Sequence, residues 1–424
     1  MNSNVTIGYG GSSTGGNGGN GVFNFLYGGD GGSGGNGGTV NGGNSNSVTV
    51  SSSTWSNSGS LTIGNGGSST GGNGGSKGGG IGSDGSAGSG GAVTGGNGNS
   101  LTVNNSTIYV GSSLTIGNGG SSTGGIGGTG GAVSGGNNNS LAVSNGGKVT
   151  VLGSGGSGSW STAIGYGSNS SSNSVLVTGS NSLFSNAGNL NIGYSGSFNS
   201  LTVSAGGVAV DQNGTIGYTN TSSNNSVLVT GSGSMWSNSG SLLIGNAGGG
   251  TLTLANGGSV VASGITIAAL NGSTGTLNIG SFGGTDGAGS LTVSTIAFGS
   301  GTGAINFNQT NAFTLSNAVS GNGSLNLLGT GTTTLTGSNS YTGITLISGG
   351  TLQVGTNGTN GNLGSGAITI TNAGTLVLDL SRSYVLGNAV TGAGSLRQIG
   401  SGTTTLTGAN TYSCLLYTSP SPRD

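Results

Sequence analysis

Charge is almost absent from this chain. Of its 424 residues, 5 are Lys or Arg, 6 are Asp or Glu and none is His, for a formal net charge of −1. Nucleic-acid binding needs clustered cations against the phosphates, so this composition excludes a nucleic-acid partner. A serine nucleophile needs a base, and neither His nor Glu occurs anywhere. The G-x-S-x-G match at Gly31–Gly35 therefore predicts no catalytic site.

Carboxylates are too scattered for most active sites. Before the last residues they stand alone at Asp30, Asp84, Asp211, Asp286 and Asp379. Polysaccharide-cleaving enzymes need paired carboxylates or acids grouped with cations. Calcium repeats need a recurring Asp, and zinc sites need His or Cys. We therefore predict no enzyme activity, no catalytic, cofactor-binding or metal residues, and no cofactor, and we expect Asp379 to form a surface ion pair with Arg382.

Cysteine and proline occur only at the C-terminus. Cys414, Pro420 and Pro422 all lie in SCLLYTSPSPRD, which interrupts a repeat and resembles translated library-adapter sequence. We assign residues 414–424 to a non-native tail; without it no disulfide framework is available. The start, MNSNVTIGYGG, lacks the basic and apolar regions of a secretory signal and begins within a repeat. We expect it to be a truncation point or a miscalled start.

Glycine is abundant, with 105 residues, and high glycine with low charge is typical of disorder. The apolar residues, however, form triplets such as Leu61-Thr62-Ile63 and Val48-Thr49-Val50. This alternation places the apolar pair on one side of a β-strand and Thr on the other. Glycine pairs between the triplets supply tight corners, and glycine costs about 1 kcal/mol in a helix. The pattern predicts short strands rather than disorder or helix.

Two anchors recur along the chain. One is Ile followed by Gly, at Ile7, Ile63, Ile116, Ile164, Ile192, Ile216 and Ile244. The other is the apolar residue after Asn-Ser, at Val48, Leu101, Leu141, Val175, Leu201 and Val227. The second precedes the first by 15 residues, as in Val48 and Ile63, or by 17, as in Val175 and Ile192; only Leu141 and Ile164 depart, since they are 23 residues apart. Such periods indicate stacked repeats, so we predict an all-β, parallel β-helix-like solenoid with Gly-rich insertions.

The insertions enter at one junction, between Ile-Gly and the next Asn-Ser. Lengthening a flexible loop fourfold costs only about 1.2 kcal/mol, so Gly-rich excursions can leave one corner without breaking the stack. We expect limited proteolysis to cut these tracts first, because the rungs protect the rest of the backbone. Uniform cleavage along the chain, followed by mass spectrometry, would contradict this arrangement.

Aromatic residues recur just before the Ile-Gly strand, at Trp55, Phe184 and Trp236. Because an aromatic side chain buries a large area, we expect these residues to stack inside the solenoid or at a corner. An exposed ladder that binds ligand is the alternative.

The C-terminal part resembles the passenger-associated β-strand repeat of bacterial autotransporters. The similarity rests on TTTLTG at Thr332–Gly337, NSYTG at Asn339–Gly343 and GTLQV at Gly350–Val354. A second copy begins with TTTLTG at Thr403–Gly408 and reaches Tyr412, 71 residues after Tyr341. The specific resemblance covers residues 289–413. We divide the chain into degenerate solenoid repeats with Gly-rich insertions over 1–288, passenger-associated repeats over 289–413, and the tail.

This resemblance implies a secreted or surface-displayed passenger with a structural or adhesive role, on the outer membrane of a Gram-negative bacterium. Its expected partner is an outer-membrane translocator barrel beyond this segment. Host or bacterial surface glycans, or other copies of the chain, are the expected adhesive targets. The alternative is a Gly-rich extracellular matrix or sheath protein exported by another route. An ice-binding solenoid is disfavoured, because Thr332–Thr334 and its copy are isolated rather than repeated on every rung.

Overall fold

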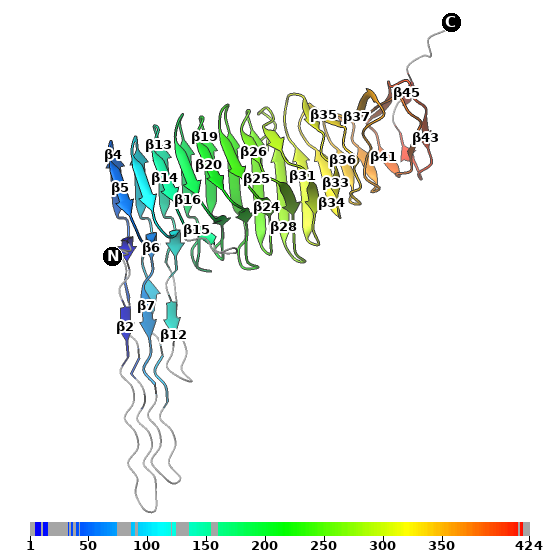
Figure 1. Cartoon of the computed structure of the whole chain (residues 1–424). Coiled ribbons are helices and arrows are strands. Elements are labelled where there is room, and N and C mark those ends of the chain that lie inside the picture. The colour runs from blue at the N-terminus through cyan, green and yellow to red at the C-terminus, as the bar shows by residue number, and fades with distance from the viewer. Residues whose placement is uncertain are drawn as a thin grey trace, which may run out of the picture. The chain divides into compact units, whose positions relative to one another are not determined.

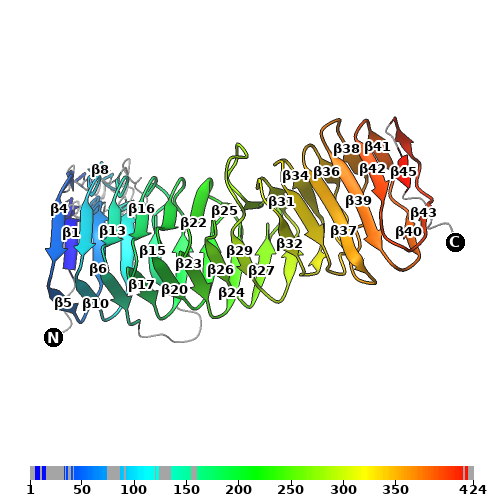
Figure 2. The same cartoon turned by 90° about the horizontal axis from the view of Figure 1, so that it is seen from above.

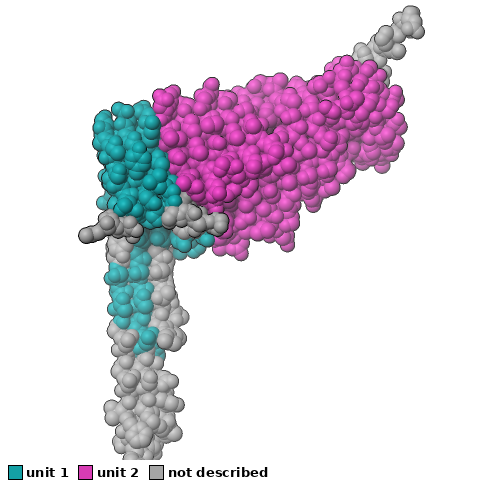
Figure 3. All heavy atoms as spheres, viewed as in Figure 1, with its two compact units in different colours: residues 1–176, 193–200 teal, residues 177–192, 201–424 magenta. Residues whose placement is uncertain are grey.

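The computed structural model divides into two compact units. Unit 1 comprises Met1–Leu176 with Gly193–Ser200, and unit 2 comprises Val177–Ile192 with Leu201–Asp424 (Figure 3). The structure describes residues 5–9, 12–15, 33, 35–36, 40–41, 43–73, 86–89, 92–119, 121–123, 135–153, 160–413 and 416–418. Each unit is a parallel β-solenoid, which confirms the fold predicted from the repeats.

Each rung of unit 1 contributes one strand to each of three parallel sheets. We name them after their sequence motifs. The Asn-Ser face contains β4 (Ser47–Ser51), β9 (Ser100–Asn104) and β13 (Ser140–Ser144). The aromatic face contains β5 (Thr54–Asn57), β10 (Thr107–Val110) and β14 (Lys148–Val151). The Ile-Gly face contains β1 (Val5–Tyr9), β6 (Leu61–Asn65), β11 (Leu114–Asn118) and β15 (Trp160–Ile164).

Unit 2 repeats the same three faces, and its rungs lie side by side in both cartoon views (Figures 1 and 2). The divisions between the units fall within β16 (Ser174–Thr178) and β19 (Ser200–Ser204) and after Ile192. The Asn-Ser face of unit 2 contains β22 (Asn225–Thr230), β25 (Gly249–Ala255), β28 (Thr274–Ile279), β31 (Thr302–Phe307), β34 (Gly323–Leu327), β36 (Thr345–Ile347), β38 (Ile368–Ile370), β41 (Val390–Gly392) and β44 (Thr411–Tyr412).

The other two faces of unit 2 are shorter. The aromatic face contains β17 (Leu183–Asn186), β20 (Val208–Asp211), β23 (Met235–Asn238), β26 (Ser259–Val261) and β29 (Ser290–Thr292). The Ile-Gly face contains β18 (Asn189–Ile192), β21 (Gly214–Ile216), β24 (Ser241–Ile244), β27 (Gly264–Ile267), β30 (Ile296–Phe298) and β33 (Val319–Ser320).

Further along unit 2 two other sheets take their place. They contain β32 (Phe313–Leu315), β35 (Thr332–Leu335), β37 (Thr351–Gly358), β39 (Thr375–Leu380), β42 (Ser395–Gln398) and β45 (Leu416–Thr418) in one, and β40 (Tyr384–Leu386) and β43 (Thr404–Leu406) in the other. Strand β45 pairs in parallel with β42, and it lies in the segment that the sequence assigned to a non-native tail.

The core follows the period-2 pattern of the triplets. Leu61 and Ile63 are fully buried, whereas Thr62 between them is half-exposed. Their register partners Leu114 and Ile116 are buried in the next rung, so equivalent side chains stack along the solenoid. Val48 is 36% exposed, because its strand β4 ends the Asn-Ser sheet and has a single neighbour, β9.

The recurring aromatics lie on the interior side. Phe184 and Trp236 are completely buried and are separated by Ala209, which is the register partner of both. Because Ala209 is small, the two large aromatic side chains on either side of it pack in neighbouring rungs without overlap. Trp55 in unit 1 is half-buried and pairs with Ile108. The prediction that these aromatic residues stack inside the solenoid or at a corner is thus confirmed, and they do not form an exposed ladder.

Candidate functional site

A column of asparagines runs through unit 1 at the corner before the Asn-Ser strands. It consists of the Asn residue of each Asn-Ser motif, at Asn46, Asn99, Asn139, Asn173 and Asn199. In each step, the backbone N–H and the side-chain Nδ2 both donate to the Oδ1 of the next asparagine. For Asn99 and Asn139 these distances are 2.9 and 3.1 Å. The last four members are completely buried, so the column is a satisfied polar network inside the protein.

The asparagine column explains why Gly follows Ile in the other motif. Gly64 has φ +76°, a left-handed conformation, and a Cβ there would overlap the amide group of Asn139. Gly117 and Gly165 meet Asn173 and Asn199 in the same way. Only glycine fits both the conformation and the contact. The Gly of each of these Ile-Gly motifs therefore contacts the Asn of an Asn-Ser motif in the neighbouring rung, which the separate spacings of the two motifs did not reveal.

The Gly-rich tracts leave this corner as strands near the stack. The triplets SST at β2 (Ser12–Thr14), β7 (Ser68–Thr70) and β12 (Ser121–Thr123) pair in parallel. Further out, the Gly72 N–H donates to Gly35 O and the Gly88 N–H to Gly72 O, both at 2.8 Å. A Cβ at Gly71 would overlap the carbonyl oxygen of Gly88. These described parts of the tracts are thus paired backbone segments, because glycine lets backbones contact directly and hydrogen-bond.

One carboxylic acid is enclosed in the solenoid. Asp211 is 2% exposed, and its Oδ2 accepts a 2.6 Å hydrogen bond from Trp236 Nε1. Its Oδ1 and both amide atoms of its register partner Asn238 are buried without a hydrogen-bond partner. Desolvation raises the pKa of Asp211 to about 8, although the Trp236 bond opposes the shift. The carboxyl is therefore protonated at neutral pH and has no access to an external substrate.

The diagnostic residues of the C-terminal repeat have structural roles in unit 2. Asn339 Oδ1 accepts the N–H of Val319 at 2.9 Å, and the Asn339 N–H donates to Asn362 Oδ1 at 2.7 Å. Tyr341 is completely buried, and its hydroxyl lies 2.8 Å from Thr345 Oγ1. Burial raises the pKa of Tyr341. In the second copy Asn410 accepts the N–H of Val390 at 3.0 Å, so the repeat again builds a corner asparagine.

A second polar column lies on the outer side of the Asn-Ser face in unit 2. Asn278 Nδ2 donates to Thr253 Oγ1 at 3.2 Å, and Asn306 Nδ2 donates to Asn278 Oδ1 at 3.0 Å. Asn326 Nδ2 then donates to Asn306 Oδ1 at 2.8 Å. These side chains are half-exposed and uncharged. We call Thr253, Asn278, Asn306 and Asn326 the outer ladder.

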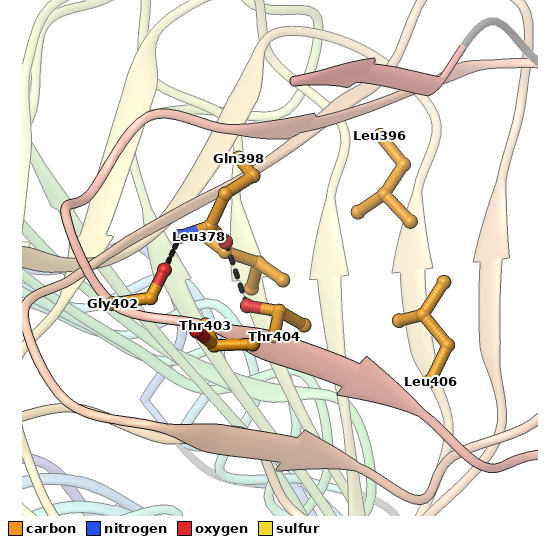
Figure 4. A pocket seen from close by; sticks show the side chains of 7 residues that line it. All are labelled: Leu378, Leu396, Gln398, Gly402, Thr403, Thr404 and Leu406. Atoms are coloured by element: carbon orange, nitrogen blue, oxygen red, sulfur yellow. Dashed lines mark hydrogen bonds between the residues drawn. The ribbon is translucent and has the colours of Figure 1, made fainter. Parts of the chain in front are cut away.

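Two hollows lie within single units. A cavity of about 310 Å³ in unit 2 is lined by Leu378, Leu396, Gln398, Gly402, Thr403, Thr404 and Leu406 (Figure 4). The side-chain amide of Gln398 is already hydrogen-bonded, because its Nε2 donates to Gly402 O at 3.0 Å and its Oε1 accepts from Thr404 Oγ1 at 2.6 Å. It therefore presents mainly leucine side chains. The other hollow, of about 350 Å³, is a polar groove in unit 1 around Lys148.

The expected ion pair between Asp379 and Arg382 is absent. The Arg382 guanidinium instead donates to Thr359 O at 2.8 Å and Gly361 O at 2.9 Å, and lies over the Tyr384 ring at 5.0 Å. Asp379 accepts from Gln353 Nε2 at 3.0 Å. Carbonyl oxygens just after the end of β37 bind the arginine, so proximity in sequence did not predict its partner.

The described residues include only some of the acids and motifs considered above. Asp30, Asp84, Cys414 and most of Gly31–Gly35 lie outside the described residues. Among the residues that are described, Asp211, Asp286 and Asp379 stand apart, and no three of His, Cys, Asp or Glu gather. No helix in the described part of the chain is long and apolar enough to cross a membrane.

Comparison with known proteins agrees with the C-terminal repeats. Residues 325–354 and 396–413 match the Passenger-associated-transport-repeat family. The Adhesin BmaC autotransporter of Brucella suis biovar 1 (strain 1330) is 36% identical over 114 residues, which are 26% of this chain. The chain spans only 3% of the length of that relative.

A solved structure of a hyper-glycosylated TibA fragment, modified by TibC, is similar with a TM-score of 0.33 and 15% identity. That similarity covers 87% of this chain and 98% of the fragment. The matched repeats contain the corner asparagines and the interior Tyr341 described above. Two C-terminal segments of this parallel β-solenoid are thus similar to an autotransporter passenger repeat, and about a quarter of the chain is similar to an autotransporter adhesin.

Proposed function

We propose that this passenger is an adhesive surface protein whose Asn-Ser face makes many weak contacts with other surfaces. The outer ladder carries the proposal. Its four side chains are linked rung to rung at 2.8 to 3.2 Å, so the polar groups are held in place before any partner binds. Preorganised groups lose little entropy on binding. Repetition along a solenoid then raises avidity without a strong single site.

The near absence of charge supports adhesion rather than electrostatic capture. With 5 basic and 6 acidic residues in the whole chain, two copies or two cells repel each other little through this protein. The name of the BmaC relative, an adhesin, points in the same direction. Surface glycans and other copies of the chain remain the proposed partners.

We also propose that the passenger is not catalytic. Among the described acids, Asp211 is buried and enclosed with Trp236 and Asn238, whereas Asp286 and Asp379 are far apart in sequence and lie on different rungs. Catalysis by carboxylates needs two of them beside a substrate. In the whole protein, an outer-membrane translocator would export the passenger to the cell surface.

The division at residue 288 also stays a proposal. The family match lies entirely within 289–413, at 325–354 and 396–413. In the same region two other sheets, which begin with β32, accompany the Asn-Ser face. We therefore propose that 289–413 is the passenger-associated module and that 1–288 carries the insertions.

Adhesion can be tested with beads coated with the purified chain, scored for binding to cells and for clumping. We expect Asn306→Glu, which places a charge in the outer ladder, to weaken adhesion at least tenfold. Thr266→Glu is the matched control, because Thr266 is half-exposed on β27 of the Ile-Gly face. Coated beads that bind and clump no more than bare beads would contradict the adhesive function. Equal losses from both variants would show that the Asn-Ser face is not the contact surface.

A further inference from the structure

A polar groove crosses three rungs of unit 1 where the Asn-Ser face turns into the aromatic face. It is lined by Ser52, Ser53, Thr54, Asn105, Ser106, Thr107, Gly146 and Lys148, and its volume is about 350 Å³. Register brings its ends together, because Thr54 pairs with Thr107 and Thr107 pairs with Lys148. We call it the corner groove. Its volume lies within the range of about 300–1,000 Å³ found for small-ligand sites.

The floor of the corner groove is rigid. The Thr107 N–H donates to Ser53 O at 3.0 Å, and the Lys148 N–H donates to Ser106 O at 2.7 Å. Ser106 Oγ is used internally, since it donates to Asn104 O at 2.8 Å and accepts from the Ser53 N–H at 3.2 Å. The backbone therefore positions the lining side chains without help from a ligand.

Several polar side chains of the corner groove nevertheless remain available to bind a ligand. Within the described part of the chain, no hydrogen bond engages the hydroxyls of Ser52, Thr54 and Thr107 or the side-chain amide of Asn105. Ser52, Thr54 and Asn105 are exposed and Thr107 is half-exposed. Hydroxyl and amide groups both donate and accept, which suits a ligand that is itself covered with hydroxyls.

Lys148 adds a single positive charge. It is exposed, and it is the one charged side chain among the described residues of unit 1. No described carboxylate neutralises it there. One isolated cation among hydroxyls fits one carboxylate on a mostly neutral ligand. It does not fit a polyphosphate, which needs several cations.

Tyr109 provides an aromatic surface beside the groove. It follows Thr107 by two residues on the same outer side of β10 and is 40% exposed. Its register partners, Ser56 and Thr150, are small and leave the ring uncovered. A tyrosine combines an apolar ring with a polar tip, as needed for a molecule with apolar and polar faces.

We propose that the corner groove and Tyr109 form a binding site for a carboxylate-bearing glycan. Lys148 pairs with the carboxylate, the Ser, Thr and Asn groups bond to sugar hydroxyls, and Tyr109 packs against the apolar face of a ring. A peptide fits less well, because the groove has no apolar pocket for an anchoring side chain. The inference rests on the proposed adhesive function and assigns it a ligand class.

The test is binding of the full chain to a printed panel of uronate- and sialate-terminated oligosaccharides and their carboxyl-reduced counterparts. We expect binding to carboxylate members, weaker at high salt. We expect Lys148→Gln to reduce it at least tenfold while leaving binding to reduced members unchanged. Tyr109→Ala should weaken both kinds of ligand, whereas Tyr218→Ala, an exposed tyrosine of unit 2, should weaken neither. All three side chains are exposed, so the variants should fold.

Two results would overturn the site. One is equal binding of acidic and reduced oligosaccharides, or none to either; the other is unchanged binding after both Lys148→Gln and Tyr109→Ala. The bead assay separates this failure from failure of the adhesive function. Beads coated with the double variant that still adhere as the wild type does would reject the corner groove and keep adhesion. Wild-type beads that do not adhere would reject the adhesive function itself.

Discussion

Replacing Asp211 with asparagine is expected to stabilise the protein at neutral and alkaline pH. The pKa of the folded carboxyl is raised to about 8 from 3.8, so the folded state holds a proton that the unfolded state releases. Stability therefore falls as pH rises from about 4 to about 8, by at most about 1.4 kcal/mol per pH unit. Asparagine removes this loss, because it does not ionise.

The local structure accepts asparagine at this position. Asn238 is the register partner of Asp211 in the next rung, and an asparagine Oδ1 can still accept the Trp236 Nε1–H. The check is urea unfolding of both proteins at pH 4, 6 and 8.5. The gain should be small at pH 4, which is close to the unfolded pKa of 3.8, and largest at pH 8.5. A gain of the same size at every pH would show that ionisation of Asp211 is not its cause.

Breaking the asparagine column of unit 1 is expected to cause the largest loss of stability. Asn139→Leu keeps a similar volume but removes the acceptor for the Asn99 N–H and Nδ2, and the donor to Asn173 Oδ1. These groups are completely buried, and an unsatisfied buried group costs about 1–3 kcal/mol. We expect a loss of about 3 kcal/mol or more.

The loss should be local, because each rung of a solenoid contacts mainly its neighbours. Hydrogen exchange should show reduced protection in β9, β13 and β6, beside the replaced residue. Asn169→Leu is the matched control, since Asn169 is exposed in a turn, and it should change stability by less than about 0.5 kcal/mol. If both variants lose equal stability, the column does not hold the corner together.

The strands were predictable because their signal is local. Alternation within Leu61-Thr62-Ile63 determines which side chains point inward, and the structure buries Leu61 and Ile63 as expected. The recurrence of Trp55, Phe184 and Trp236 likewise indicated an interior position, which Phe184 and Trp236 occupy fully. The repeat around Asn339 and Tyr341 was recognisable because two copies share it.

Other contacts could not be predicted from the sequence, for a physical reason. The asparagine column joins residues separated by 53, 40, 34 and 26 positions, since some rungs carry insertions of different lengths and others carry none. Constant spacing therefore could not reveal it, although the Asn before each Ser was a visible signal. For Asp379 and Arg382 the prediction was wrong. Their closeness in sequence suggested an ion pair, but Arg382 donates to the carbonyl oxygens of Thr359 and Gly361 instead.

The sequence by itself determined the all-β class, the rung period, the inward residues and the near absence of charge, because these depend on composition and on neighbours two residues apart. Tertiary structure alone decided which polar groups meet. Parallel stacking enclosed Asp211 beside Trp236, aligned Asn278 with Asn306, and brought Thr54, Thr107 and Lys148 into one groove. Such contacts arise between rungs, where the partner of each residue depends on the length of everything inserted between them.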